Sequence, residues 1–156
     1  NAAFDAAGLD AVYVPLQAAA FDDFLAFADA MGIEGASVTI PFKLDALRAA
    51  SRCDAVTTEV GAANTLERLS EGGWRAHNTD VEGFALALAH VCRATLAGQR
   101  VVLIGAGGAA RAAVVHLARA GVDLAIVNRT PETAAQLVAE LLRRLDEYAV
   151  KRPRKP

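Results

Sequence analysis

The sequence predicts an α/β fold with a mainly parallel sheet, on three observations. Strand-like runs of branched apolar residues alternate with amphipathic helical segments along most of the chain. A continuous apolar strand at 101–104 leads straight into a glycine-rich turn and a helix. Apolar residues make up 54% of the 156 residues, which excludes disorder for most of the chain.

The first elements follow from local signals. A strand is predicted over 11–16, and an amphipathic helix over 21–32 ends at Gly32 because glycine readily adopts the left-handed conformation of a helix end. The next strand is predicted over 37–40, with Val and Ile as branched apolar residues. Pro41 closes it because proline lacks a backbone donor.

The middle of the chain continues the alternation. Helices are predicted over about 43–50 and 54–60, and the turn residues at 69–73 predict a hairpin. A further helix is expected over about 81–93. The segment 94–99 is the expected lobe boundary, because a new β–α–β pattern begins immediately after it.

The glycine-rich turn has the G-x-G-x-x-A spacing, with Gly105, Gly107 and Ala110 at the spaced positions. Gly105 permits a tight turn, Gly107 lets the backbone approach a pyrophosphate, and Ala110 allows close packing of helix on strand. The turn follows a strand, opens a helix and precedes a second strand, which is the context that dinucleotide binding requires. The alternative is a glycine-rich turn with a structural role only.

The end of the second strand indicates which dinucleotide is bound. An NAD site would place an acidic residue about 20 positions past the glycines. Here the chain carries Asn128, Arg129 and Thr130. Arg129 can pair with a 2′-phosphate or stack on adenine, so NADP is favoured over NAD. The alternative is a surface arginine beside a turn.

Three polar residues stand at the ends of strand-like segments in the first lobe: Lys43, Asn64 and Asp80. Each has an ordinary explanation, since Lys43 could be a solvated first-turn residue, Asn64 a turn residue and Asp80 a helix N-cap. Together they supply a cation, an amide and a carboxylate at the strand ends where α/β folds gather ligands. Such a set can grip and deprotonate a polyhydroxylated substrate.

Five motifs in one order carry a family resemblance: SVTIPFK, GAANTL, NTDVEG, GAGGAA and NRT. With these motifs the chain resembles shikimate dehydrogenase over residues 1 to about 142. The resemblance implies an NADP-linked enzyme that reduces 3-dehydroshikimate to shikimate in aromatic amino-acid (chorismate) biosynthesis. It also implies a substrate-binding α/β lobe followed by a truncated Rossmann-type dinucleotide-binding lobe.

The resemblance also assigns residues. Lys43 and Asp80 match the catalytic pair, and Thr39 and Asn64 match binders of substrate hydroxyl or carbonyl groups; Lys43 and Asp80 contact the substrate as well. The matched cofactor-binding residues are Gly105, Ala106, Gly107, Gly108, Ala109, Asn128, Arg129 and Thr130. No metal is implied.

The sequence departs from the family in ways that affect the domain prediction. The family's serine-rich start and its later half are absent, and Thr133 stands where a basic residue is expected, so the chain is predicted to be an internal part of the family's chain or a truncated product. The predicted domains are a catalytic lobe over 1–93 with its start missing, the first part of an NADP-binding Rossmann lobe over 94–146, and a disordered basic tail over 147–156.

An exposed sheet edge and an uncovered apolar helix face are expected in this truncated lobe. The chain is therefore predicted either to self-associate, for example as a homodimer, or to be only marginally stable. The face is formed by Leu137, Leu141 and Leu142.

Composition argues against nucleic acid and membranes as partners, and a small-molecule substrate is expected. A net charge of −2 gives no field for nucleic acid or an anionic membrane, and no apolar run reaches the length of a membrane span. Cys53 and Cys92 fit a reducing cytoplasm. His77 could touch the substrate.

The competing functional interpretations are a non-catalytic nucleotide-binding fragment or remnant and a quinate/shikimate-type polyol dehydrogenase.

Overall fold

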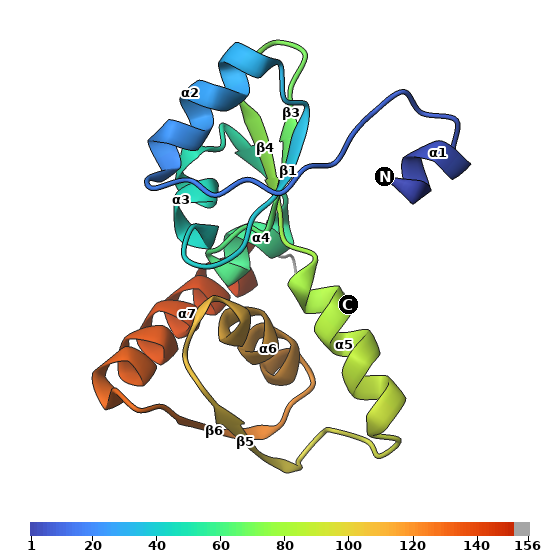
Figure 1. Ribbon diagram of the computed structural model, residues 1–156. Helices are drawn as coiled ribbons and strands as arrows, with labels where there is room; N and C mark the ends of the chain where they lie inside the picture. The colour runs from blue at the N-terminus through green and yellow to red at the C-terminus, as the bar shows by residue number, and fades with distance from the viewer. Residues whose placement is uncertain (152–156) are drawn as a thin grey trace. The chain divides into compact units, whose positions relative to one another are not determined.

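The computed structural model describes residues 1–151 and the side chains as far as residue 144. The chain divides into two compact units, Asn1–Gly32 and a larger unit that starts at Ile33 (Figure 1). Among the described residues, no helix is both long and apolar enough to cross a membrane.

The first unit contains α1 (Ala2–Ala6) and α2 (Phe21–Met31). The predicted end of α2 is confirmed, because Gly32 caps it in the left-handed conformation with φ 63°. The strand predicted over 11–16 is wrong: this segment belongs to neither sheet of the described chain. An extended run becomes a strand only when a neighbour completes its hydrogen-bond ladder, and an apolar pattern cannot supply that neighbour.

The larger unit begins with a four-stranded sheet in the order β1-β3-β4-β2. Its strands are β1 (Gly35–Ser37), β2 (Arg52–Cys53), β3 (Thr65–Arg68) and β4 (Trp74–His77). The predicted hairpin is confirmed as the antiparallel pair β3–β4. The α/β class holds, but this sheet is not mainly parallel: β1–β3 is also antiparallel, and only β2–β4 is parallel. A short turn between consecutive strands can join them only in antiparallel fashion.

The strand predicted over 37–40 ends early, at Ser37. Val38 N–H still donates to the Asn64 carbonyl at 2.7 Å, but the chain then turns, and Phe42 N–H donates to the Thr39 carbonyl at 3.0 Å. Ile40 is therefore 78% exposed rather than part of a buried strand. The next helix begins directly after this turn, at Lys43.

Two short helices follow as predicted, α3 (Lys43–Ala49) and α4 (Ala55–Val60). The Asp54 carboxylate caps α4 by accepting from Thr57 N–H at 2.7 Å.

The chain continues through α5 (Asp80–Val91), β5 (Arg100–Ile104), α6 (Gly108–Arg119), β6 (Asp123–Val127) and α7 (Pro131–Lys151). β5 and β6 pair in parallel, as the β–α–β pattern predicts. Figure 1 shows α6 and α7 on the same side of these two strands.

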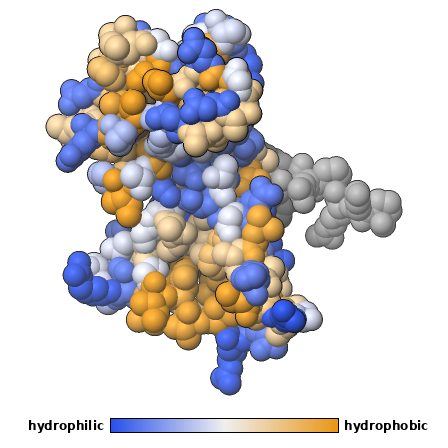
Figure 2. Space-filling view, turned by 45° about the vertical axis from the view of Figure 1, so that its right-hand side comes forward, coloured by the Kyte–Doolittle hydropathy of each residue, from blue (hydrophilic) through white to orange (hydrophobic). Residues whose placement is uncertain are grey.

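The opposite face of the β5–β6 pair is open. Val102, Ile104 and Val127 are 63%, 85% and 55% exposed there. Figure 2 shows apolar residues gathered at the bottom of the view, the end where Figure 1 places these strands.

The prediction that Leu137 and Leu141 form an uncovered helix face is wrong. They are 3% and 1% exposed, and only Leu142 of the predicted face is open, at 56%. Both buried leucines pack with Val60 of α4 and Val115 of α6 in one hydrophobic cluster. Helices from both predicted lobes therefore share a core.

The predicted domain boundary at 93/94 remains a prediction. The predicted tail, 147–156, begins within α7, which continues to Lys151; residues 152–156 lie outside the described part of the chain.

Candidate active site

The structure brings Lys43, Asn64 and Asp80 together. Lys43 begins α3, Asp80 begins α5 and Asn64 immediately precedes β3. Lys43 Nζ lies 2.6 Å from Asp80 Oδ2, and Asn64 Nδ2 lies 2.8 Å from Asp80 Oδ1. One carboxylate therefore holds the ammonium with one oxygen and the amide with the other. The Lys43 and Asp80 side chains are 13% and 26% exposed, so the pair is partly shielded yet reachable.

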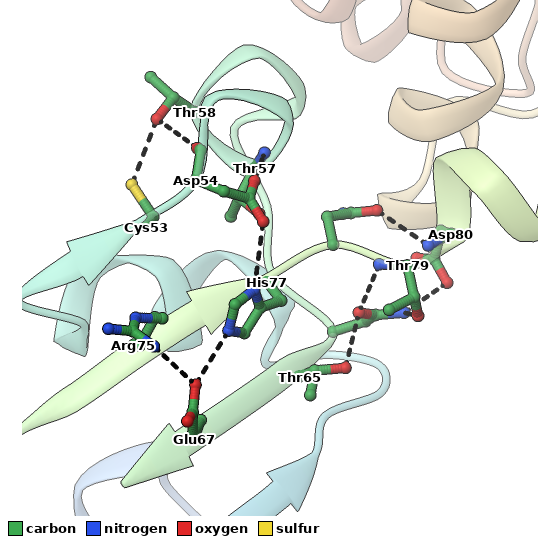
Figure 3. Close-up of polar contacts among 12 residues, drawn as sticks. Cys53, Asp54, Thr57, Thr58, Thr65, Glu67, Arg75, His77, Thr79 and Asp80 are labelled. Carbon is green, nitrogen blue, oxygen red and sulfur yellow. Dashed lines mark hydrogen bonds and ion pairs between the residues drawn. The ribbon is translucent and has the colours of Figure 1, made fainter. Parts of the chain in front are cut away.

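The amide of Asn64 has a fixed orientation. Its Oδ1 accepts from Thr79 N–H at 3.0 Å and from the Thr65 hydroxyl at 3.0 Å. A backbone N–H can only donate, so this contact identifies the amide oxygen and directs the NH₂ group at Asp80. Figure 3 shows Thr65, Thr79 and Asp80 gathered at the open end of the β3–β4 hairpin.

Asn78 is a structural residue of the site that the sequence did not reveal. It is 7% exposed; its Nδ2 donates to the Ala62 carbonyl at 2.8 Å and its Oδ1 accepts from Asp80 N–H at 3.0 Å. The side chain thus ties the loop before Asn64 to the start of α5. An asparagine two residues before a helix is a common capping residue, and this signal could have identified it.

The glycine turn lies against Lys43. Gly105 has φ 110°, and its N–H donates to the Val127 carbonyl at 2.7 Å. A Cβ placed on Gly108 would lie 3.4 Å from Lys43 Cδ, so the aliphatic part of Lys43 packs beside the turn. Lys43 therefore contacts both the Asp80 carboxylate, through its ammonium, and the predicted cofactor turn, through its aliphatic stem.

The first turn of α6 suits an anion. Gly107 is its N-cap and makes no side-chain capping bond, and a Cβ at Gly107 would meet nothing within 4 Å. The space beside Gly107 and the positive end of the helix dipole are thus open to a phosphate, although Ala110 N–H already donates to the Gly107 carbonyl at 3.0 Å. The residues present fit the pyrophosphate of a dinucleotide.

The second half of the predicted cofactor site follows β6. Asn128 Nδ2 donates to the Thr130 carbonyl at 2.9 Å, which shapes the turn into α7. Arg129 and Thr130 are exposed. Because β5 and β6 are parallel, this turn and the glycine turn lie at the same edge of the sheet.

Among the described residues, neither the Thr39 hydroxyl nor the His77 ring is hydrogen-bonded to the cluster of Lys43, Asn64 and Asp80. Only the His77 backbone is, since its carbonyl accepts from Asn64 N–H at 3.0 Å. Thr39 lies exposed in the turn that precedes α3. The His77 ring instead bridges two carboxylates, with Nδ1 3.1 Å from Asp54 and Nε2 3.3 Å from Glu67 (Figure 3). Its hydrogen bond and that of Arg75 hold the pKa of Glu67 below its usual value.

Comparison with known proteins identifies the family. Residues 1–66 match the family model of the shikimate dehydrogenase substrate binding domain, and residues 87–151 match that of shikimate / quinate 5-dehydrogenase. The chain belongs to the shikimate dehydrogenase family. Shikimate dehydrogenase (NADP(+)) of Anaeromyxobacter sp. strain K is 45% identical over 148 residues, which cover 90% of this chain and 50% of that protein.

Solved structures of the family agree. A shikimate dehydrogenase in complex with NADP⁺ is 33% identical with a TM-score of 0.80, covering 93% of this chain and 50% of that one. Shikimate 5-dehydrogenase from Thermus thermophilus, in complex with NADP(H) and shikimate, is 32% identical with a TM-score of 0.70, covering 89% and 52%. The chain spans about half the length of the family members that it matches.

Proposed function

We propose that this chain carries the catalytic cluster and the first part of the cofactor site of an NADP-dependent shikimate dehydrogenase. The reaction is the reduction of 3-dehydroshikimate to shikimate. The observation that carries the proposal is the position of Lys43, whose ammonium is 2.6 Å from Asp80 and whose stem lies against Gly108 of the glycine turn. Carbonyl reduction needs a proton donor beside the cofactor, and the position of Lys43 supports that role.

Lys43 and Asp80 have different roles in the proposed proton transfer. NADPH, when bound, supplies the hydride. Lys43 donates the proton to the substrate carbonyl oxygen and takes it back in the reverse direction. Asp80 holds the ammonium in line and can accept a hydrogen bond from a neighbouring substrate hydroxyl. Lys43 and Asp80 are directly hydrogen-bonded to each other, so the pair would act as one acid/base unit.

The cofactor would be held at two turns that follow parallel strands. Residues 105–109 would form the turn around the pyrophosphate, although the Gly105 N–H itself is used by the Val127 carbonyl. Residues 128–130 lie where the adenosine phosphate is expected. We propose Thr39 as a further substrate contact, since it precedes α3 in an exposed turn.

The test is shikimate-dependent reduction of NADP⁺ by an extended chain, in which the flanking segments come from the Anaeromyxobacter relative. Turnover with shikimate supports the proposal. Turnover with quinate alone would favour the second candidate, a quinate dehydrogenase, which the matched shikimate / quinate family model makes reasonable. Binding of NADP⁺ without turnover of either acid would leave a nucleotide-binding module and contradict the proposed activity.

The extended chain should prefer NADPH to NADH because Arg129 stands where NAD sites carry an acid. Arg129→Ala should weaken NADPH by about 1.5–3 kcal/mol, the usual value of a hydrogen bond to a charged group, and leave NADH unchanged. Isothermal titration at low salt measures both affinities. Arg93→Ala, at another exposed arginine, is the control. Equal wild-type affinities for the two cofactors would refute the assignment.

We also propose that the chain self-associates through the open face of the β5–β6 pair, where Val102, Ile104 and Val127 are exposed. Sedimentation velocity should show association that increases with concentration, and Ile104→Lys should reduce it. A monomer at every concentration would rule the association out.

A reducing compartment such as the cytoplasm is proposed because Cys53 and Cys92 are both free thiols.

A further inference from the structure

Two arginines and a glutamate join three helices of the larger unit. Glu140 on α7 accepts from Arg111 Nη2 of α6 at 2.6 Å. It also accepts from Arg144 Nε and Nη2, one turn further along α7, at 3.1 and 3.0 Å. We name these three residues the arginine clamp.

The clamp grips the end of α4. Arg111 Nη1 donates to the Val60 carbonyl at 3.3 Å, and Arg144 Nη1 donates to the Thr58 carbonyl at 2.9 Å. Carbonyls in the last turn of a helix have no partner within the helix and carry the negative end of its dipole. Two guanidinium groups therefore satisfy and neutralise this end.

Gly61 makes the close approach possible. It ends α4 with φ 70°, and a Cβ at this position would lie 2.8 Å from Arg144 Nε. The guanidinium of Arg144 thus lies directly on the glycine backbone, in space that any side chain would occupy.

The gripped end of α4 leads straight into the catalytic cluster. Ala62 and Ala63 are fully buried and immediately precede Asn64. The Ala62 carbonyl accepts from Asn78, and Ala63 N–H donates to the Lys43 carbonyl at 2.8 Å. On the other side, Arg111 lies three residues after Gly108, in the helix that opens from the glycine turn.

The clamp is charged and partly shielded. Arg111, Glu140 and Arg144 side chains are 12%, 26% and 29% exposed. The hydrogen bond from Arg111 holds the pKa of Glu140 below its usual value, against the burial that would raise it. Glu140 is therefore ionised at neutral pH and binds both guanidinium groups as a carboxylate.

We propose that the arginine clamp is a positioning element, which holds the Ala62–Ala63–Asn64 segment in place relative to the glycine turn. The three residues do not touch the substrate or the reacting atoms; they act through the backbone of this segment. The inference extends the proposed function, because the segment carries the amide that holds Asp80. The alternative is an ion network that stabilises the whole fold without acting on this segment in particular.

Hydrogen exchange of backbone amides in the chain as it exists separates the two, without any ligand. In Glu140→Gln, protection from exchange should fall at the backbone amides of Ala63 and Asn64. The amides of Leu66 in β3 and Ala76 in β4 should keep their protection. Glu132→Gln, at an exposed position in the first turn of α7, should change none of these amides. Arg144→Lys keeps the charge but loses the two-pronged bond, and should give a smaller loss at the same two positions.

Two results would overturn the proposal. One is unchanged exchange at Ala63 and Asn64 in both clamp variants. The other is an equal loss of protection at Leu66 and Ala76, which would show global destabilisation only. If Glu140→Gln does not fold, Arg144→Lys decides the question on the same criterion. Failure of NADP⁺ or shikimate to bind would refute the proposed function and leave this measurement intact.

Discussion

Lys43→Ala should lower the turnover of the extended chain by about 10²–10⁴-fold, the usual contribution of a positioned acid/base group. The lysine ammonium is hydrogen-bonded to Asp80 at 2.6 Å, and its removal should deprive the substrate carbonyl of the proposed proton donor. NADPH affinity should stay nearly unchanged, because the Lys43 atoms nearest to Gly108 are aliphatic carbons and the ammonium is hydrogen-bonded to Asp80. Steady-state rates and NADPH titration measure the two effects separately.

The same experiment has a matched control and a second variant. Arg48→Ala removes a cation from the same helix, at a side chain that is 72% exposed, and should leave turnover unchanged. Asp80→Asn should also slow turnover, and the double variant should lose less than the sum of the single losses, because the pair acts as a unit. Near-normal turnover of Lys43→Ala, or a loss confined to NADPH affinity, would show that Lys43 is not the acid/base residue.

Arg119→Leu should have the largest effect on stability, about 3–5 kcal/mol, because it leaves a buried carboxylate without its partner. Glu59 is 2% exposed, and both of its oxygens accept from the Arg119 guanidinium, with Nε 3.2 Å from Oε1. Arg119 is 40% exposed and partly solvated, which places the expected loss toward the lower end of that range. Urea unfolding followed by circular dichroism measures the free energy of unfolding.

The double variant Glu59→Leu/Arg119→Leu should recover most of that loss, since an apolar pair replaces the buried ion pair at little cost. Arg48→Leu breaks the exposed pair with Asp45 and should change stability by less than about 1 kcal/mol. If Arg119→Leu costs no more than Arg48→Leu, water must satisfy the Glu59 carboxylate and this explanation fails.

Local signals predicted the local structure well. Gly32 ends α2, the turn residues at 69–73 join β3 to β4, and the glycine turn opens α6, as expected from short-range chemistry. Lys43, Asn64 and Asp80 come together as predicted. Asn64 immediately precedes β3 and Asp80 follows β4, so the antiparallel pairing of these two strands brings them to the same end of the hairpin. Their roles remain proposals.

Features that depend on distant partners were not predictable in the same way. The segment 11–16 has a strand pattern, but a pattern does not show whether a neighbouring strand exists. Leu137 and Leu141 were expected to be uncovered, but α4, about 80 positions earlier in the chain, helps to cover them. A contact over that separation leaves no local signal in the sequence. The arginine clamp spans similar separations: Arg144 and the Thr58 carbonyl are 86 residues apart. Sequence periodicity indicates which face of a helix is apolar and not what covers that face.

The most direct test of the central claim is a shikimate titration of the extended chain, observed by NMR with labelled lysine and asparagine side chains. The site predicts that shikimate shifts the Lys43 ε-methylene and Asn64 side-chain amide signals, and that NADPH shifts the backbone amides of residues 105–108. Saturation with shikimate that leaves both the Lys43 and Asn64 signals unchanged would contradict the proposed active site.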